Sequence, residues 1–400
     1  MSISDEPRSA FDRCRIAARS APTTYRHLYS GRLKMTSYRS FLSASKTLLP
    51  VAFLSLTISQ SHAELAPDLP PGGNFALENW RLDMPVANPT TGFPLSIAPM
   101  HLRGSNGFTL APWFHTDTDG AMTLWTPVNG VTIGGSRHPR NELREMLDSS
   151  NHTVTWNSQG NAILEAKLRV MQVPRDGILI VGQVHGFDAA PLVLVYYRYD
   201  FAKQTGRVIT KLQGTPVLGP PYTQHVIANN VKLGDAFSYL IKVERQPGGP
   251  AVASVSANNG IPATMVMDPS WDGIGMYFKA GSYLHTYGTS GTEGGLAKFY
   301  LLATSHPANG LSITSGETLP QAGVNIPYSL QLLSRGGVGG GTWTLVSGFP
   351  PAGLTLHFNG VIEGTPLPGA ASPIANEFMV RVRDANGSTY SKKLSILVNP

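Results

Sequence analysis

The chain has 400 residues, among them 31 lysines and arginines, 25 aspartates and glutamates, and one cysteine. This length is enough for two ordinary domains and excludes a single small module. The net charge of +6 belongs to residues 1–63, because nine basic and three acidic residues lie there and the rest of the chain carries 22 of each sign. The body therefore lacks the net positive field that favours nucleic acid, and we expect no nucleic-acid partner.

Residues 1–63 have the pattern of an export leader. Met35 opens a basic run, the apolar stretch 47–59 follows, and a small-x-small triplet ends at Ala63. This order is typical of a signal peptide, and the apolar stretch is shorter than the ~20 residues of a membrane-spanning helix. We expect translation to start at Met35 and cleavage after Ala63. Residues 1–34 are then explained by an upstream start codon or, alternatively, by a long natural leader.

The cysteine count limits the chemistry of the exported chain. The one cysteine, Cys14, lies in the leader, so the mature chain is expected to have no thiol. Disulfides, Cys-ligated metals and Cys nucleophiles are thereby excluded. We expect a secreted or periplasmic bacterial protein, monomeric and without stable membrane insertion.

From residue 74 to about 308, short β-rich runs alternate with Gly, Pro, Asn and Asp, and no long stretch has a sustained helical period. This pattern predicts an all-β protein with a jelly-roll β-sandwich. Segment 290–297 and parts of 87–110 are expected to be long irregular loops. Strands are expected at residues 162–171, 177–185, 192–199, 237–243 and 251–255.

Three of the strand-like runs carry polar residues at a spacing of two. The first is Arg140–Arg144, in which Arg140, Glu142 and Arg144 share one face of a strand. Two guanidiniums with a carboxylate between them can receive a planar carboxylate bidentately. A structural salt-bridge ladder is the alternative, because ion pairs also cluster without function.

The second run carries Gln183 and His185 after the apolar segment 178–181. These two side chains project together from an otherwise apolar strand, where an unpaired polar group would be costly. An amide beside an imidazole can polarise an acid group and take a proton. A hydrogen-bonded structural histidine is the alternative explanation.

The third run, Tyr277–Tyr283, places Tyr277, Lys279, Gly281 and Tyr283 on one face. A phenol beside cations can serve as a proton carrier, and Gly281 would let a ligand approach the backbone. Packing in the core or at the rim of a sheet is the alternative for the tyrosines. The three runs together make a stronger indication than any one of them.

The tail from 311 to 400 indicates a second, smaller all-β unit. The runs Trp343–Leu356, Gly360–Pro366 and Phe378–Asp384 resemble the immunoglobulin-like, cadherin-related repeats appended to many secreted bacterial enzymes. The resemblance implies a small immunoglobulin-like β-sandwich. We expect a spacer without chemistry, with sugar binding as the alternative.

The three polar runs, in this order, resemble the signature blocks of polysaccharide lyase family 7, the alginate lyases. The resemblance spans about 74–306 and includes flanking stretches at 79–85 and 298–300. Two departures border the expected substrate groove. Asn141 stands where the family usually has Ser or Thr, and Leu284-His285 stands where it usually has Asn-Gln.

The resemblance implies β-elimination on a uronic-acid polymer, with loss of the C5 proton and expulsion of the O4-linked sugar to leave a 4,5-unsaturated uronate. Arg140 and Gln183 match the residues that neutralise the carboxylate, and preorganised donors do this best. His185 matches a residue that holds the carboxylate or acts as base. Tyr283 matches the proton donor to the leaving oxygen and, for mannuronate, the base as well.

The remaining block residues are expected to bind substrate, and the scheme needs no metal and no cofactor. Glu142 would orient the arginines. Neighbouring uronates of the anionic polysaccharide would be bound by Asn141, Arg144, Tyr277 and Lys279.

Two other functions stay open at this point. One is the same elimination on another polyuronate such as glucuronan, although Val at the middle of Gln-Val-His leans toward mannuronate-rich alginate. The other is a non-catalytic polyuronate-binding or adhesion protein. The intact set of Arg140, Gln183, His185 and Tyr283 favours an enzyme, because a lectin needs no proton carrier.

Overall fold

The computed structural model describes residues 65–132, 136, 138–245, 248–308 and 311–400. The expected leader, with Cys14, Met35 and the cleavage after Ala63, lies outside these residues. Within the described part of the chain, no helix is both long and apolar enough to cross a membrane.

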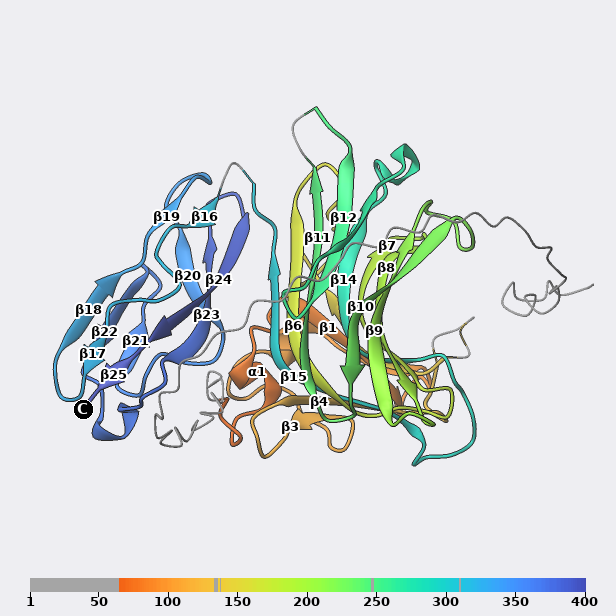
Figure 1. Cartoon of the computed structure of the whole chain (residues 1–400), viewed down its shortest axis with the longest axis horizontal. Helices are drawn as coiled ribbons and strands as arrows, with labels where there is room; N and C mark the ends of the chain where they lie inside the picture. Colours follow the sequence, from red (N-terminus) through yellow and green to blue (C-terminus); the bar gives the residue numbers. More distant parts are fainter. Residues whose placement is uncertain (1–64, 133–135, 137, 246–247, 309–310) are drawn as a thin grey trace, which may run out of the picture. The chain divides into compact units, whose positions relative to one another are not determined.

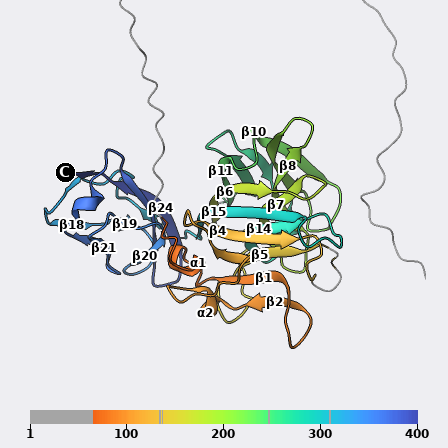
Figure 2. The same ribbon diagram turned by 90° about the horizontal axis from the view of Figure 1, so that it is seen from below.

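One antiparallel sheet of eight strands carries all three polar runs. Its strands are β1 (Trp80–Ala87), β2 (Pro94–Ile97), β5 (Arg140–Glu145), β7 (Ile178–Gly186), β8 (Pro191–Asp200), β9 (Thr205–Gln213), β10 (Tyr222–Val231) and β14 (Met276–Leu284). The strand order is β10-β9-β8-β7-β14-β5-β1-β2. Strands far apart in the sequence are thereby brought next to one another, as Figure 2 shows for β7, β14 and β5.

A second antiparallel sheet of seven strands packs against the first. Its strands are β3 (Phe114–Thr116), β4 (Met122–Pro127), β6 (Ala162–Gln172), β11 (Ala236–Arg245), β12 (Ala251–Ala257), β13 (Ala263–Val266) and β15 (Gly294–Ser305). The order is β13-β12-β11-β6-β15-β4-β3. One hydrophobic cluster fills the space between the sheets (Figure 1), as in a β-sandwich.

The C-terminal strands form small sheets of their own. They are β16 (Ser312–Ile313), β17 (Ala322–Gly323), β18 (Tyr328–Gln331), β19 (Ser334–Arg335), β20 (Thr342–Ser347), β21 (Leu354–Leu356), β22 (Val361–Gly364), β23 (Asn376–Arg383), β24 (Thr389–Ile396) and β25 (Val398–Asn399). Two three-stranded sheets, β18-β22-β21 and β20-β23-β24, enclose a separate apolar cluster around Trp343 and Phe378. The short helices are α1 (Pro71–Asn74), α2 (Pro99–Leu102), η1 (Pro269–Trp271) and η2 (Pro368–Ala370).

The predicted all-β fold is confirmed, and a strand lies at each of the five expected ranges. The loop expected at 290–297 is wrong in its second half, because β15 begins at Gly294. A Cβ on Gly294 would lie 2.1 Å from the carbonyl oxygen of Thr126, so the two glycines that look like loop residues allow β15 to lie close to its neighbours. The loop expected within 87–110 likewise contains β2 and α2.

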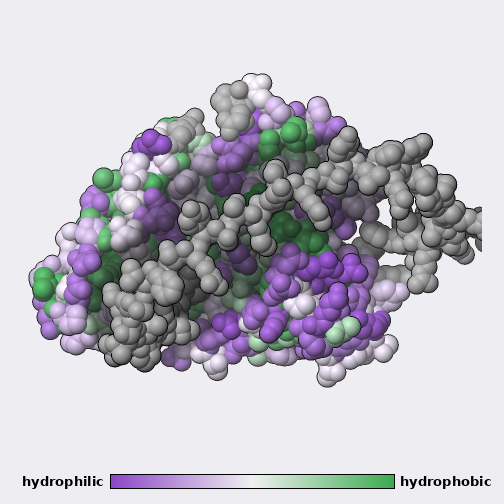
Figure 3. Space-filling view, in the orientation of Figure 1, coloured by the Kyte–Doolittle hydropathy of each residue, from purple (hydrophilic) through white to green (hydrophobic). Residues whose placement is uncertain are grey.

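Alternation along the strands separates the two faces of the eight-stranded sheet. Leu143, Val184, Phe278 and Ala280 point into the core and are at most 1% exposed. The residues between them point to the opposite face, because successive side chains of a strand alternate. In the space-filling view, hydrophobic residues gather where the visible surface is hollowed and hydrophilic residues dominate around them (Figure 3).

Candidate active site

The three polar runs meet on adjacent strands. Lys279 of β14 lies opposite both Arg144 of β5 and Gln183 of β7. Tyr283 lies opposite Arg140, and Tyr277 lies opposite His185. This register puts the side chains on one face of the sheet, which we call the polar face. Its members are Arg140, Glu142, Arg144, Gln183, His185, Tyr277, Lys279 and Tyr283.

Glu142 is the hub of the polar face. Its carboxylate, 1% exposed, accepts hydrogen bonds from the amide of Gln183 and the ammonium of Lys279. Nη1 of Arg140 lies 3.8 Å from the same carboxylate. A buried carboxylate is tolerated only when it is paired in this way, so Glu142 fixes the positions of its three partners. The residue was expected to orient both arginines, but Arg144 binds elsewhere.

Arg140 is the cation of the polar face that the protein leaves partly unpaired. Its Nη2 donates to the hydroxyl of Ser136 over 3.2 Å, whereas its buried Nε has no hydrogen-bond partner among the residues that the structure describes. The guanidinium also lies 4.4 Å from the ring centroid of Tyr283. An unsatisfied guanidinium beside a phenol is a suitable receptor for a carboxylate.

His185 is held as a neutral imidazole. Its Nδ1 lies 2.7 Å from the carbonyl oxygen of Gly186, and its ring stacks on Tyr277 with centroids 5.5 Å apart. Because a carbonyl oxygen accepts, Nδ1 carries the proton and Nε2 keeps a lone pair. Burial lowers the pKa of His185 below its ordinary value. At neutral pH the side chain can therefore take a proton.

Tyr283 is held as a protonated phenol. Burial raises the pKa of its hydroxyl above the ordinary value, and the charge of Arg140 offsets part of that rise. The phenol is therefore a proton donor at neutral pH rather than a standing phenolate. His185 and Tyr283 thus have opposite proton states on the same face, which suits a base and an acid.

Lys279 and Arg144 are largely occupied by the protein. Lys279 is 4% exposed, and burial lowers its pKa although Glu142 opposes that effect. Arg144 is 4% exposed, donates to the carbonyl oxygens of Glu145 and His152, and lies 3.9 Å from the ring centroid of Tyr277. Both cations act on the site through their neighbours.

The expected role of Asn141 in substrate binding needs correction. Asn141 alternates with Arg140 and Glu142, so it points to the core side and is fully buried. Its amide donates to the carbonyl oxygens of Trp113 and Trp125, over 2.8 Å and 3.0 Å. The residue holds the two sheets together.

Gly281 also has a different role from the one expected. A Cβ at this position would lie 2.3 Å from the carbonyl oxygen of Asn141 on the neighbouring strand. The missing side chain therefore admits the backbone of β5 rather than a ligand.

Further residues on this side of the sheet were not singled out as site residues from the sequence. His138 lies two residues before Arg140 and His285 lies two residues after Tyr283, and this spacing of two is the signal that could have found them. Arg198 of β8 and Arg207 of β9 lie directly opposite each other. Like charges in that arrangement are unfavourable unless an anion lies between them.

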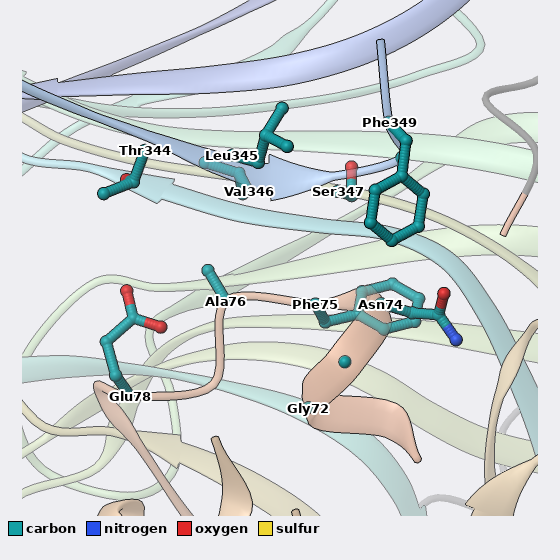
Figure 4. A pocket seen from close by; sticks show the side chains of 12 residues that line it. Gly72, Asn74, Phe75, Ala76, Glu78, Thr344, Leu345, Val346, Ser347 and Phe349 are labelled. Carbon is teal, nitrogen blue, oxygen red and sulfur yellow. The ribbon is translucent and has the colours of Figure 1, made fainter. Parts of the chain in front are cut away.

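Other parts of the described chain are weaker candidates for a functional site. No cluster of three or more His, Cys, Asp or Glu side chains suited to a metal occurs among the residues that the structure describes. A pocket of about 270 Å³ is lined by segments 72–78 and 344–349, and Glu78 is its one ionisable side chain (Figure 4). In that view the carboxylate of Glu78 lies at the opposite end from Phe349. This pocket contains none of the residues on the polar face.

Comparison with known proteins finds a matching family and similar structures. The family model described as alginate lyase matches residues 75–306. Alginate lyase A1-II′, a member of polysaccharide lyase family 7, is 34% identical with a TM-score of 0.52, over 59% of this chain and 98% of that one. An alginate lyase from Pseudomonas aeruginosa is 32% identical with a TM-score of 0.51, over 58% and 99%.

Two further findings complete the comparison. The alginate lyase from Klebsiella pneumoniae, at 24% identity and a TM-score of 0.52, covers 60% of this chain and 99% of its own, and shares the fold. No curated protein gives a significant match. Because the family model covers more than half of the chain, the chain belongs to the alginate lyase family and is a polysaccharide lyase.

Proposed function

We propose that the polar face cleaves alginate by β-elimination, with a separate role for each group that meets the reacting sugar. Arg140 and Gln183 bind the carboxylate of the reacting uronate, which lowers the barrier to removing the neighbouring C5 proton. His185 takes that proton through Nε2. The C4–O4 bond breaks, its electron pair stays on O4, and the hydroxyl of Tyr283 protonates this oxygen.

One observation carries these roles. A neutral imidazole and a protonated phenol share the polar face with a guanidinium whose Nε is unpaired. Base, acid and carboxylate receptor are the three groups that the elimination requires. On mannuronate, Tyr283 itself is the proposed base as well as the acid. Tyr277 and Lys279 support the site by stacking on His185 and by pairing with Glu142.

Related structures support alginate as the substrate. A variant of alginate lyase A1-II′ has been crystallised with the product GGG, and another with the substrate GGMG, each 33% identical to this chain. The test is to incubate the protein separately with polymannuronate, polyguluronate and glucuronan. We expect rising ultraviolet absorbance from unsaturated product with an alginate block. Product from glucuronan alone would overturn the assignment of substrate, and binding without product would favour an adhesion protein.

We further propose that residues 74–308 form the catalytic domain and that residues 311–400 form an immunoglobulin-like spacer domain. The two three-stranded C-terminal sheets and their separate core support this division. The fragment 311–400, prepared alone, should unfold cooperatively and should not bind alginate. Alginate binding by the fragment would assign it a sugar-binding role instead.

Export is a proposal that depends on the leader pattern alone. We propose a secreted or periplasmic monomer that begins at Glu64. N-terminal sequencing of protein recovered from a bacterial host, with its mass in solution, tests both points. A protein that retains residues 1–63 inside the cell would contradict export.

A further inference from the structure

His138 and His285 extend the polar face beyond Tyr283. Tyr283 lies opposite Arg140, and the backbone N–H of Leu284 donates to the carbonyl oxygen of Pro139 over 3.1 Å. The antiparallel register therefore continues one step past the end of the strands and sets His285 opposite His138. Their ring centroids are 5.9 Å apart.

His138 is the centre of a cluster of rings. Its centroid lies 6.4 Å from that of Tyr283 and 6.2 Å from that of Tyr287, both edge to face. Tyr283 and His285 are also edge to face, at 6.3 Å. His285 and Tyr287 are exposed, whereas His138 is partly buried and its Nδ1 has no hydrogen-bond partner within the described part of the chain. Two exposed rings are thus set beside the proposed acid.

The segment that carries the exposed rings is fixed in place. Arg175 donates through Nη2 to the carbonyl oxygen of Tyr287 and pairs with Glu293 at 3.1 Å. The N–H of Gly288 donates to the carbonyl oxygen of Val128 over 2.9 Å. Rings that are already fixed lose little conformational entropy when a sugar binds, and this raises the affinity.

The charges around the two histidines favour an anionic sugar. Arg140 of β5 and Lys211 of β9 act on the pair as cations, and Asp176, just before β7, opposes them. Arg198 and Arg207 lie on the same side of the sheet, because they alternate with the core residues Tyr197 and Val208. Three of the four cations lie on β8 and β9, and the fourth, Arg140, lies on β5. His285 directly follows β14, which lies between those strands in the sheet, so there are cations on both sides of it.

We propose that His285, backed by His138 and joined by Tyr287, is a specificity-determining site for the uronate sugar that carries the leaving oxygen. This inference depends on the proposed function, because the position of that sugar follows from Tyr283 as the acid. The imidazole of His285 has one donor and one acceptor for the sugar's hydroxyls, and the ring of Tyr287 offers an apolar surface. His138 is a positioning residue that supports both rings.

The proton state of the pair agrees with this role. Partial shielding from water lowers the pKa of both His138 and His285, although Asp176 opposes this effect at both and a hydrogen bond to the backbone of His285 opposes it at His138. Both are neutral at neutral pH and therefore bind by hydrogen bonds rather than as fixed charges. The amide of a glutamine at this position would also donate and accept, but it differs from an imidazole in reach and shape.

The test compares His285→Ala, His285→Gln and His138→Asn in the full chain, with kcat and KM measured on the alginate block that the protein cleaves. His285→Ala should raise KM about 10-fold and leave kcat within about twofold. His285→Gln should restore KM to within about threefold, because it keeps hydrogen bonding. His138→Asn should raise KM less than His285→Ala does.

His225→Ala is the matched control, since His225 is an exposed histidine on β10 that is not on the polar face. It should change neither constant. An unchanged KM for His285→Ala would overturn the inference, and so would a fall in kcat alone, which would assign the imidazole to the proton chemistry of Tyr283. An equal loss with the Gln variant would also overturn it.

Failure of the proposed function has a different signature. If the parent protein releases no unsaturated product, that function is wrong whatever the variants do. Calorimetric titration with polymannuronate then compares the same proteins by affinity. The inference still predicts about 10-fold weaker binding for His285→Ala and no change for His225→Ala; equal affinities would overturn it.

Discussion

Strands β5 and β6 have similar sequence patterns and very different surroundings. Both place charged side chains at every second position, as with Glu142 in β5 and Glu165 in β6. Opposite Glu165, the neighbouring strands place Leu240 and Ala303, and burial raises the pKa of Glu165. Glu142 is instead bound by Lys279 of the neighbouring strand β14 and by Gln183 of β7, the strand beyond it. Alternation alone does not make a site; complementary groups on adjacent strands do.

The largest effect is expected on turnover, because only the sheet that contains β5 carries the proposed site. Tyr283→Phe removes one hydroxyl and should lower kcat about 10²–10⁴-fold, because a general acid is lost. Its thermal unfolding midpoint and its binding of polymer should stay close to those of the parent. Ultraviolet absorbance of unsaturated product measures the rate. Activity near that of the parent would remove Tyr283 from the mechanism.

The next effect is on stability and separates the two strands directly. Lys279→Met removes the ammonium that is hydrogen-bonded to the buried carboxylate of Glu142, leaves it only the more distant Arg140 as a cation, and should lower the free energy of unfolding by about 3–5 kcal/mol. The matched change Lys167→Met in β6 should alter it by no more than about 0.5 kcal/mol, since no ion pair found among the described residues includes Lys167. Urea denaturation of both variants measures this. Equal losses in the two variants would mean that the charged side chains of β5 are no more tightly paired than those of β6.

The pH dependence of kcat/KM tests the proton states on the polar face. The pKa of His185 is lowered, so its basic form persists below the ordinary value of 6.5 and the acid limb should have its midpoint there. The pKa of Tyr283 is raised, so the alkaline limb should lie above the ordinary value of 10.0. His285→Gln should leave the acid limb in place. An acid limb above 6.5 would show that the burial of His185 does not govern its protonation.

The smallest effect concerns salt. Arg144 and Lys279 are buried and Arg140 is only partly exposed, so exposed cations such as Arg207 are better placed to attract a polyuronate. Arg207→Met should flatten the fall of kcat/KM with added NaCl, because exposed charges are screened over about 8–10 Å. Lys203→Met, a control at an exposed ion pair with Asp200, should leave the slope unchanged. Equal slopes in both variants would place the attraction elsewhere.

Much of the fold could be predicted from the sequence, because period-two alternation marks strands whatever their partners are. The register could not, since it depends on pairing between residues more than 100 positions apart, such as Lys279 with Arg144. Gly294 was misassigned to a loop for the same reason. A glycine is needed there because a neighbouring strand lies too close for a side chain.

The site shows the same limit. Spacing placed Arg140, Glu142 and Arg144 on one face correctly, but it could not say which cations the protein itself occupies. Asn141 was misjudged because its neighbours in sequence suggested a substrate contact, whereas alternation turns it toward the carbonyl oxygens of Trp113 and Trp125.

The central claim is elimination rather than hydrolysis on the polar face. The most direct measurement is the mass spectrum of oligosaccharides released from the preferred alginate block in water enriched in ¹⁸O. Elimination adds no water, so each cleavage should give one unsaturated end, and the products should carry no more ¹⁸O than intact oligosaccharides gain by exchange of their anomeric oxygen in the same water. Saturated products that carry one ¹⁸O for each cleavage would contradict the account.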